Sequence, residues 1–122
     1  MNVAEDVSFR PHLLRAMCAW CAEKEYTPYI AAEADGPGVQ IPPNAAGGGK
    51  TVILNISPQA VRDLSVGETV SFTARFRGAA FHVILPIESV TGIYARETGS
   101  GLSFPPAAPR AKPDNGPSLR VV

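Results

Sequence analysis

Two cysteines are the first residues whose type and spacing could support chemistry. Cys18 and Cys21 are the two cysteines of the 122-residue chain, and the segment Cys-Ala-Trp-Cys matches the redox motif C-x-x-C. A reactive cysteine in that motif needs a helix N-terminus after a strand, where the helix dipole lowers the thiol pKa. Here the pair falls in the middle of an expected helix, with no strand before it. We therefore interpret both cysteines as small apolar residues of a helix face, and a thiol enzyme as the weaker alternative.

The sequence gives little support for a metal site or for a phosphate-binding loop. A zinc site would need a second pair of ligands, which His12 and His82 do not supply by their spacing. The segment 47–51, Gly-Gly-Gly-Lys-Thr, resembles the end of a phosphate-binding loop, but that motif requires glycine at Asn44 and a helix after the lysine. The chain continues instead with Val-Ile-Leu-Asn-Ile, which is typical of a strand. Without a nucleophile elbow or a clustered Ser/His/Asp set, we predict a protein that is not an enzyme and needs no cofactor or metal.

The composition excludes further classes. The chain has 11 basic and 11 acidic residues, so a nucleic-acid partner is not expected, because such proteins usually carry a basic excess. No apolar run approaches the ~20 residues that a membrane span requires. The acidic N-terminus lacks the apolar region of a secretory signal, which predicts a cytoplasmic protein with reduced cysteines.

The chain then divides into elements that would position these residues. Residues 8–25 are expected to form a helix, with Ser8 near its N-cap, Pro11 in its first turn and an end before Thr27-Pro28. Its apolar residues recur at helical spacing: Leu13, Leu14, Met17, Cys18 and Cys21. Strands are predicted over residues 29–33, 39–41, 51–56, 69–77, 81–85 and 90–95, with a helical turn or two over 57–64.

Residues 69–77 alternate most clearly. Val70, Phe72, Ala74 and Phe76 fall on one face, and Ser71, Thr73, Arg75 and Arg77 on the other. Gly78 then allows a hairpin turn. The predicted fold class is α+β, mostly β, with an N-terminal helix packed on a small, mostly antiparallel β-domain.

The residues from Pro105 onward are mainly proline, alanine, glycine and polar side chains, and we expect them to be disordered. The last residues, Leu119 to Val122, are nevertheless apolar apart from Arg120. A flexible segment with such an end is typical of a tethered docking peptide, although a frayed terminus remains open.

Several stretches, in their order and spacing, resemble the stringent starvation protein B (SspB) family. They are Arg10 to Ala16 with Trp20, Thr27-Pro28, Pro37 to Gln40, Ile53 to Ile56, Phe72 to Gly78, Ile93 to Glu97 and the tail Gly116 to Val122. The resemblance covers residues 8–104 nearly continuously. It implies a helix on an Sm-like barrel of two antiparallel sheets, and an adaptor that delivers ssrA-tagged proteins from stalled ribosomes to the ClpXP protease.

The resemblance also implies a division of the chain into three parts. Residues 1–104 would bind the tag and dimerise, 105–117 would be a flexible linker, and 118–122 would dock on the N-terminal zinc-binding domain of ClpX. The docking residues would be Leu119, Arg120, Val121 and Val122. A homodimer would form through the helix, with Leu14, Met17, Cys18 and Cys21 divided between the core and the partner helix.

For the tag itself, the resemblance points to the strand Phe72–Phe76. Ala74 would matter there, because a larger side chain would fill the channel. Arg75, Phe76, Asn55 and Gln40 are further candidate wall residues. Tyr94 and Arg96 are as readily explained by strand packing. The alternative function is an Sm-like RNA-binding or ribosome-associated module, for which Arg75, Arg77 and Arg96 form a thin basic set.

Overall fold

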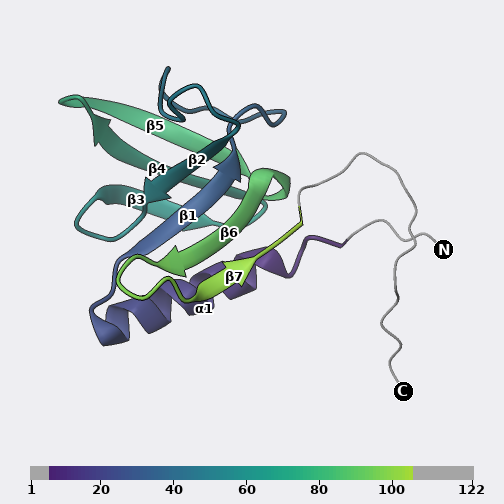
Figure 1. Ribbon diagram of the computed structural model, residues 1–122, viewed down its shortest axis with the longest axis vertical. Helices are drawn as coiled ribbons and strands as arrows, with labels where there is room; N and C mark the ends of the chain where they lie inside the picture. The colour runs from purple at the N-terminus through teal and green to yellow at the C-terminus, as the bar shows by residue number, and fades with distance from the viewer. Residues whose placement is uncertain (1–5, 106–122) are drawn as a thin grey trace.

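One helix and two antiparallel sheets make up residues 6–105, the part of the chain that this computed structural model describes (Figure 1). The elements in chain order are α1 (Arg10–Lys24), β1 (Pro28–Glu33), β2 (Thr51–Asn55), β3 (Val61–Val66), β4 (Thr69–Phe76), β5 (Ala79–Pro86), a short 3-10 turn (Ile87–Ser89), β6 (Val90–Ala95) and β7 (Gly101–Ser103). The first sheet has the order β2-β1-β6-β7 and the second the order β3-β4-β5. The predicted α+β, mostly β class is therefore confirmed.

The helix begins two residues later than predicted. Its N-cap is Phe9, without a side-chain cap bond among the described residues, and a proline occupies the first turn as expected. Ser8 lies one residue before the N-cap, and its hydroxyl donates to the Asp6 carboxylate over 2.6 Å. The helix ends at Lys24, and its C-cap Glu25 has a φ of 63°, in the left-handed region that closes many helices.

The prediction of helical turns over 57–64 is wrong beyond its first residues. Ser57 to Ala60 form a turn, and the chain then continues as β3. Val61 pairs with Ala74 and Val66 with Val70, so the edge of β4 supplies the backbone partners that a helix would have found internally.

Two smaller differences also arise from strand pairing. Of the strand expected over 39–41, only Gln40 forms a bridge, with Ile84. The sequence did not predict β7, which pairs with β6. Gly101 permits this approach, because a Cβ atom there would lie 2.1 Å from the Ile93 carbonyl oxygen.

The β4–β5 hairpin follows the sequence closely. Eight residues of each strand are in continuous register, from Thr69 opposite Pro86 to Phe76 opposite Ala79. The two-residue turn has positive φ at both positions, 54° at Arg77 and 82° at Gly78. This is the backbone of a type I′ turn, whose twist matches that of the flanking strands.

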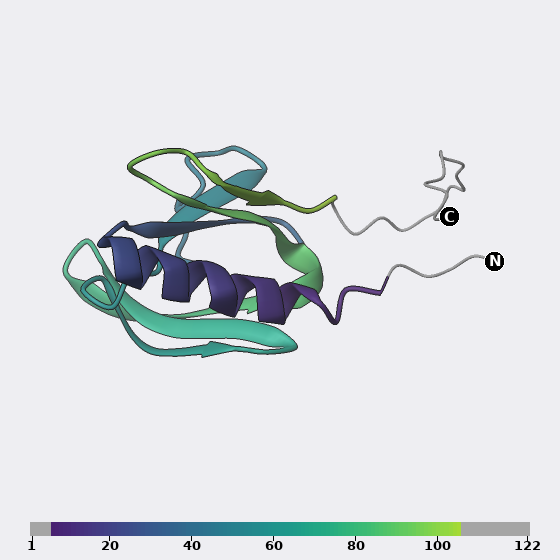
Figure 2. The same ribbon diagram turned by 90° about the horizontal axis from the view of Figure 1, so that it is seen from below.

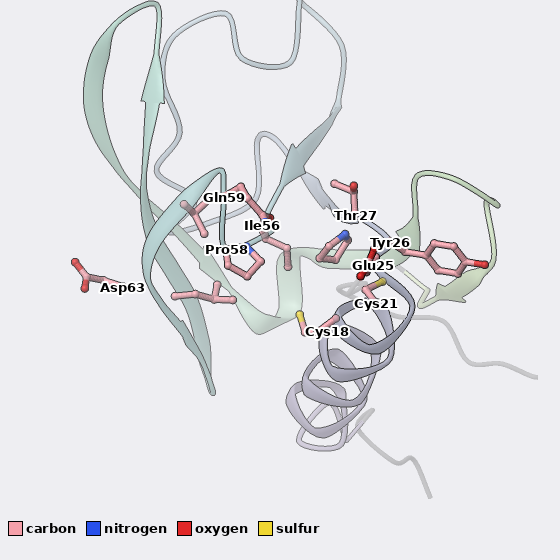
Figure 3. Close-up of a pocket in the computed structure, with 13 residues that line it drawn as sticks. Cys18, Cys21, Glu25, Tyr26, Thr27, Ile56, Pro58, Gln59 and Asp63 are labelled. Atoms are coloured by element: carbon pink, nitrogen blue, oxygen red, sulfur yellow. The ribbon is translucent and has the colours of Figure 1, made fainter.

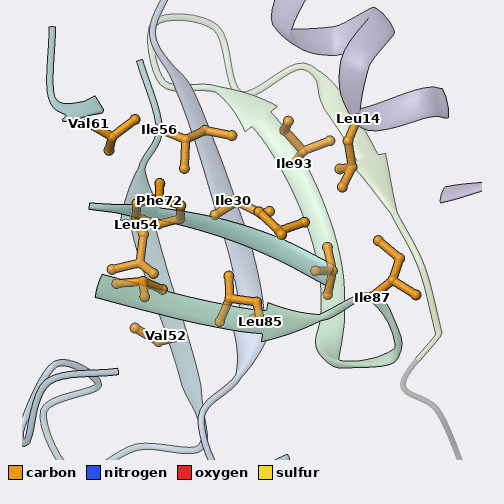
Figure 4. Close-up of a cluster of buried hydrophobic side chains, with 14 of the residues drawn as sticks. Leu14, Ile30, Val52, Leu54, Ile56, Val61, Phe72, Leu85, Ile87 and Ile93 are labelled. Carbon is orange, nitrogen blue, oxygen red and sulfur yellow. The ribbon is translucent and has the colours of Figure 1, made fainter. Parts of the chain in front are cut away.

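The core lies between the two sheets, and α1 packs along one side of them (Figures 2 and 4). In β1, β2 and β4, every second residue points inward, as do Ile30, Leu54 and Phe72. The helix contributes Leu14, which is 1% exposed. The sheets and the helix thus share one apolar interior.

Arg10 is a fully buried cation at the start of the helix. Its guanidinium donates to the carbonyl oxygens of Val90, at 2.8 Å, and Pro105, at 3.0 Å. It also lies 4.9 Å from the centre of the Phe104 ring. These contacts tie the beginning of α1 to the residues that follow β7.

Candidate functional site

The end of β4 next to the hairpin turn is the structural setting of the predicted tag site. Val70 and Phe72 are fully buried between the sheets, whereas Ala74 and Phe76, on the same face, are only half-buried against the core. In Figure 1 the hairpin extends beyond β2, the outermost strand of the first sheet. The first sheet therefore covers one end of β4 more completely than the other.

Ala74 is a short side chain among larger ones. Its partner across β3 is Val61, and its partner across β5 is Phe81. Phe76, two residues along the strand, meets Phe81 edge to face, with ring centres 6.2 Å apart. A methyl group flanked by a valine and two aromatic rings leaves an apolar surface whose depth depends on residue 74.

The other predicted wall residues are less close to this surface. Phe72 has no exposed area and supports the surface from within the core. Arg75 lies on the opposite face of β4, is exposed and donates to the Gly78 carbonyl over 3.0 Å. The structure therefore brings Ala74 and Phe76 together but directs Arg75 away from them.

Gln40 and Asn55 lie at strand edges. Gln40 bridges the outer edge of β5 and donates from its side chain to the His82 carbonyl over 2.9 Å. Asn55 ends β2, is exposed and accepts from the Ser57 backbone N–H over 2.9 Å. Both residues are accessible at the rims of the two sheets.

Tyr94 and Arg96 belong to the outside of the first sheet. Tyr94 pairs with Tyr29, and the two rings meet with centres 5.8 Å apart. Arg96 is exposed and lies 3.6 Å from the Glu97 carboxylate. Because Ile93 and Ala95 fill the inner positions of β6, these two side chains face away from Ala74.

The helix residues proposed for a dimer separate into two groups. Leu14 and Cys21 are buried inside the monomer, and Met17 and Cys18 are half-buried against its core. The exposed face of the helix carries His12, Arg15, Ala16, Ala19, Ala22 and Glu23. A partner helix would meet these outer residues before it met Leu14 or Cys21.

A pocket of about 750 Å³ lies between the end of α1, the 56–59 turn and β3 (Figure 3). Cys18 and Cys21 form its helix wall, and Ile56 and Pro58 lie opposite. Asp63 is also among the lining residues, but its carboxylate points away from the pocket in Figure 3. The walls therefore combine apolar side chains and two thiols with polar groups such as those of Thr27 and Gln59.

The two thiols are unsuited to nucleophilic chemistry at neutral pH. Burial, with a smaller contribution from Cys21, raises the pKa of Cys18 to about 11. Burial and then the nearby Glu97 charge raise the pKa of Cys21. Both side chains stay protonated, which agrees with their interpretation as apolar helix residues.

Sequence reasoning missed one residue of this region, Phe81. Its opposition to Ala74 follows from the hairpin register once the turn is placed at Arg77-Gly78, so the signal was present. The docking residues Leu119 to Val122 lie outside the described part of the chain. Within residues 6–105, no helix has the length and apolar character needed to cross a membrane.

Comparisons with known proteins bear on the whole chain. A family model described as "Stringent starvation protein B" matches residues 8–119. The chain is also 36% identical over 98 residues to the "Stringent starvation protein B homolog" of Haemophilus influenzae. That alignment covers 80% of this chain and 65% of the relative, so the chain spans slightly less than two thirds of the relative's length. The similarity therefore includes the helix, both sheets and the surface around Ala74.

Proposed function

The chain belongs to the stringent starvation protein B family, and on that premise we propose that it is an adaptor for proteolysis rather than an enzyme. The folded body binds the ssrA tag of proteins released from stalled ribosomes, and the C-terminal residues tether the complex to ClpX. The protein is cytoplasmic, where both partners act.

The observation that carries the tag-binding proposal is the surface around Ala74. An extended peptide with an aromatic side chain needs an apolar surface with room for a ring, and alanine between Val61 and Phe81 leaves such room. A side chain longer than a methyl group would occupy the same space.

In this proposal, two copies of the chain form a homodimer through the exposed face of α1. His12, Ala16, Ala19 and Glu23 follow each other at intervals of three or four residues, which places them along one side of a helix. The two central alanines are short enough to let a second helix approach closely. Leu14 and Cys21, being buried, support this face from the inside.

The tail supplies the second binding function. Leu119, Val121 and Val122 dock in an apolar groove on the N-terminal zinc-binding domain of ClpX, with Arg120 at the rim of the groove. Burying one such side chain contributes ~1.5–3 kcal/mol before the cost of ordering the tail, so a single tail binds weakly. Two tails per dimer raise the effective affinity by ~10²–10⁴ without further contacts.

Fluorescence anisotropy with a labelled tag peptide tests whether the tag binds at the surface around Ala74. Ala74→Gln should lower tag affinity at least ~10-fold, because the longer side chain fills the binding surface. Ala80→Gln is the matched control, since Ala80 is exposed and lies opposite Arg75 on the other face of the hairpin. Equal affinities of the two variants, both with unchanged thermal unfolding, would contradict the proposed site.

Removal of residues 119–122 tests whether the tail docks on ClpX. Tag binding should remain unchanged, whereas the stimulation of ClpXP degradation of a tagged substrate should be lost. Stimulation that persists without these four residues would remove the docking role from the tail while leaving tag binding in place.

A further inference from the structure

The outer face of the second sheet, which points away from the core, carries arginines and hydroxyl groups. Strand register places Arg62 of β3, Thr73 of β4 and His82 of β5 side by side on this face. Arg75 follows Thr73 at the next outward position of β4. Both arginines are exposed, and Figure 2 shows no element of the described chain over this side of the sheet. The face is therefore open to solvent.

A third arginine, Arg77, lies in the turn at the end of the β4–β5 hairpin. Within residues 6–105, no carboxylate pairs with Arg62, Arg75 or Arg77, and neither β4 nor β5 contains Asp or Glu. Asp63 follows Arg62 along β3, but it lies in the bulge where the register with β4 is interrupted. The fold therefore leaves the positive charge of this arginine face (Arg62, Thr73, Arg75, Arg77 and His82) uncompensated.

The side chains of the arginine face have donors available for a ligand. Arg75 donates to the Gly78 carbonyl over 3.0 Å, and its other N–H groups have no acceptor within the described chain. The Thr73 hydroxyl and the Nδ1 atom of His82 lie 3.3 Å apart beside it. Guanidinium groups bind carboxylates through paired N–H donors, which makes them the usual partners of acidic side chains. The arginine face therefore has the composition of a carboxylate-binding surface.

The spacing of the arginines suits an extended chain. Arg62 and Arg75 are diagonal neighbours on adjacent strands, a relation that separates two residues by ~7–8 Å. Arg77 follows Arg75 after two further residues, at the turn. In an extended peptide, the side chains on one side also recur every two residues, about 6.7 Å apart. Acidic residues at alternate positions of such a peptide would meet successive arginines.

We propose that the arginine face binds an extended acidic segment of a partner protein, with Asp or Glu at every second residue. This inference goes beyond the proposed function and does not depend on it. The face lies on the opposite side of the second sheet from Ala74, so the acidic segment binds without occupying the proposed tag surface.

Nucleic acid fits the arginine face less well than an acidic protein segment does. No Phe, Tyr or Trp occupies an outward position of β4 or β5, so the face has none of the aromatic rings on which successive bases stack. The 11 basic and 11 acidic residues of the chain also provide no long-range attraction for a polyanion. Three arginines in one row can neutralise a few carboxylates without such a field.

The first test is fluorescence anisotropy of the full chain with a labelled seven-residue peptide in which Glu and Ser alternate. The double variant Arg62→Glu/Arg77→Glu should weaken binding about tenfold, because two attractions become repulsions. Lys24→Glu/Lys50→Glu is the control, with the same change in net charge at two exposed lysines outside the second sheet, and should weaken binding less than threefold. Equal losses in the two double variants, both with unchanged thermal unfolding, would overturn the inference.

A second peptide tests the spacing without any change to the protein. It has the same composition, with its four Glu residues contiguous, and should bind about threefold more weakly than the alternating peptide. Equal affinities would overturn the proposed spacing of the acidic residues. This comparison decides the question should the arginine double variant fail to fold.

Two competition experiments identify the occupant. A saturating tag peptide should leave binding of the alternating peptide unchanged; displacement would place both at one site and overturn the inference. If the tag peptide does not bind at all, the proposed function fails while the arginine face is unaffected. Oligouridylate that binds more tightly than the alternating peptide, and loses its binding in Arg62→Glu/Arg77→Glu, would overturn the inference by identifying nucleic acid as the occupant.

Discussion

The two ends of β4 have the same sequence pattern and different surroundings. Val70 and Phe72 have no exposed area, because the first sheet covers them, whereas Ala74 and Phe76 on the same face remain half-buried. The alternation of apolar and polar residues thus identifies the face of β4 that points away from water. It does not show which part of that face another element covers. The covered end stabilises the fold, and the partly covered end is the one available to a ligand.

The sharpest test of this contrast compares two phenylalanines of β4. Phe72→Ala should lower the free energy of unfolding by ~3–5 kcal/mol, because it leaves a cavity in the core. Phe76→Ala should cost only about 1–2 kcal/mol, since the side chain is half-buried and loses mainly its contact with Phe81. Urea unfolding measures the free energy of unfolding of both variants. Equal decreases would contradict the distinction between the two ends of β4.

Arg10, the buried cation that joins the start of α1 to the residues after β7, should show the next largest effect. Arg10→Ala removes the donors to the Val90 and Pro105 carbonyls, and should lower the free energy of unfolding by ~1.5–3 kcal/mol. Arg62→Ala, at an exposed cation of β3, is the control and should change it by less than about 0.5 kcal/mol. A similar result for both variants would mean that the buried guanidinium adds nothing to the stability of the fold.

Cys18 has an intermediate degree of cover, and its reactivity measures that cover directly. Its pKa is raised from 9.0 to about 11, so the thiolate fraction at pH 8 should be about a hundredfold lower than for an unperturbed thiol. In Cys21→Ala, alkylation of Cys18 should therefore be slow in the native protein and fast in urea. Its native rate should rise as the pH approaches 11. Equal rates in the two states would show that the pocket side of α1 is open to solvent.

Glu97 is an exposed group and should give the smallest effect. Its carboxylate accepts from the backbone N–H and the hydroxyl of Thr27, both at 2.7 Å, and these bonds lower its pKa below 4.5. A lowered pKa in the folded state stabilises the protein above pH 4.5, and this contribution is lost as the pH falls through the folded pKa. Glu97→Gln should thus be slightly less stable than the parent at pH 7. The difference should disappear on acidification, whereas a difference that grew at low pH would contradict this sign.

Much of the fold could be predicted, because local chemistry and tertiary structure agree there. Pro11 and the helical spacing of apolar residues placed α1, and the alternation of β4 with Gly78 placed the hairpin. The prediction of helical turns over 57–64 is wrong because residues 61–66 pair as a strand with β4, the next strand along the chain. Pairing of this kind overrides local preference and leaves no local signal.

Only part of the candidate site could be predicted from the sequence. Ala74 came from resemblance, and the alternation already placed Arg75 on the opposite face. The exposure of Ala74 depends on how far the first sheet extends over β4, which has no sequence pattern of its own.

The bond from Arg10 to Pro105 joins residues that are 95 positions apart. Local unfolding of the first turn of α1 and of β7 should therefore be coupled, because unwinding that turn withdraws the guanidinium that anchors the residues after β7. Amide hydrogens of these two segments should exchange with solvent at a common rate, as one subunit of local unfolding.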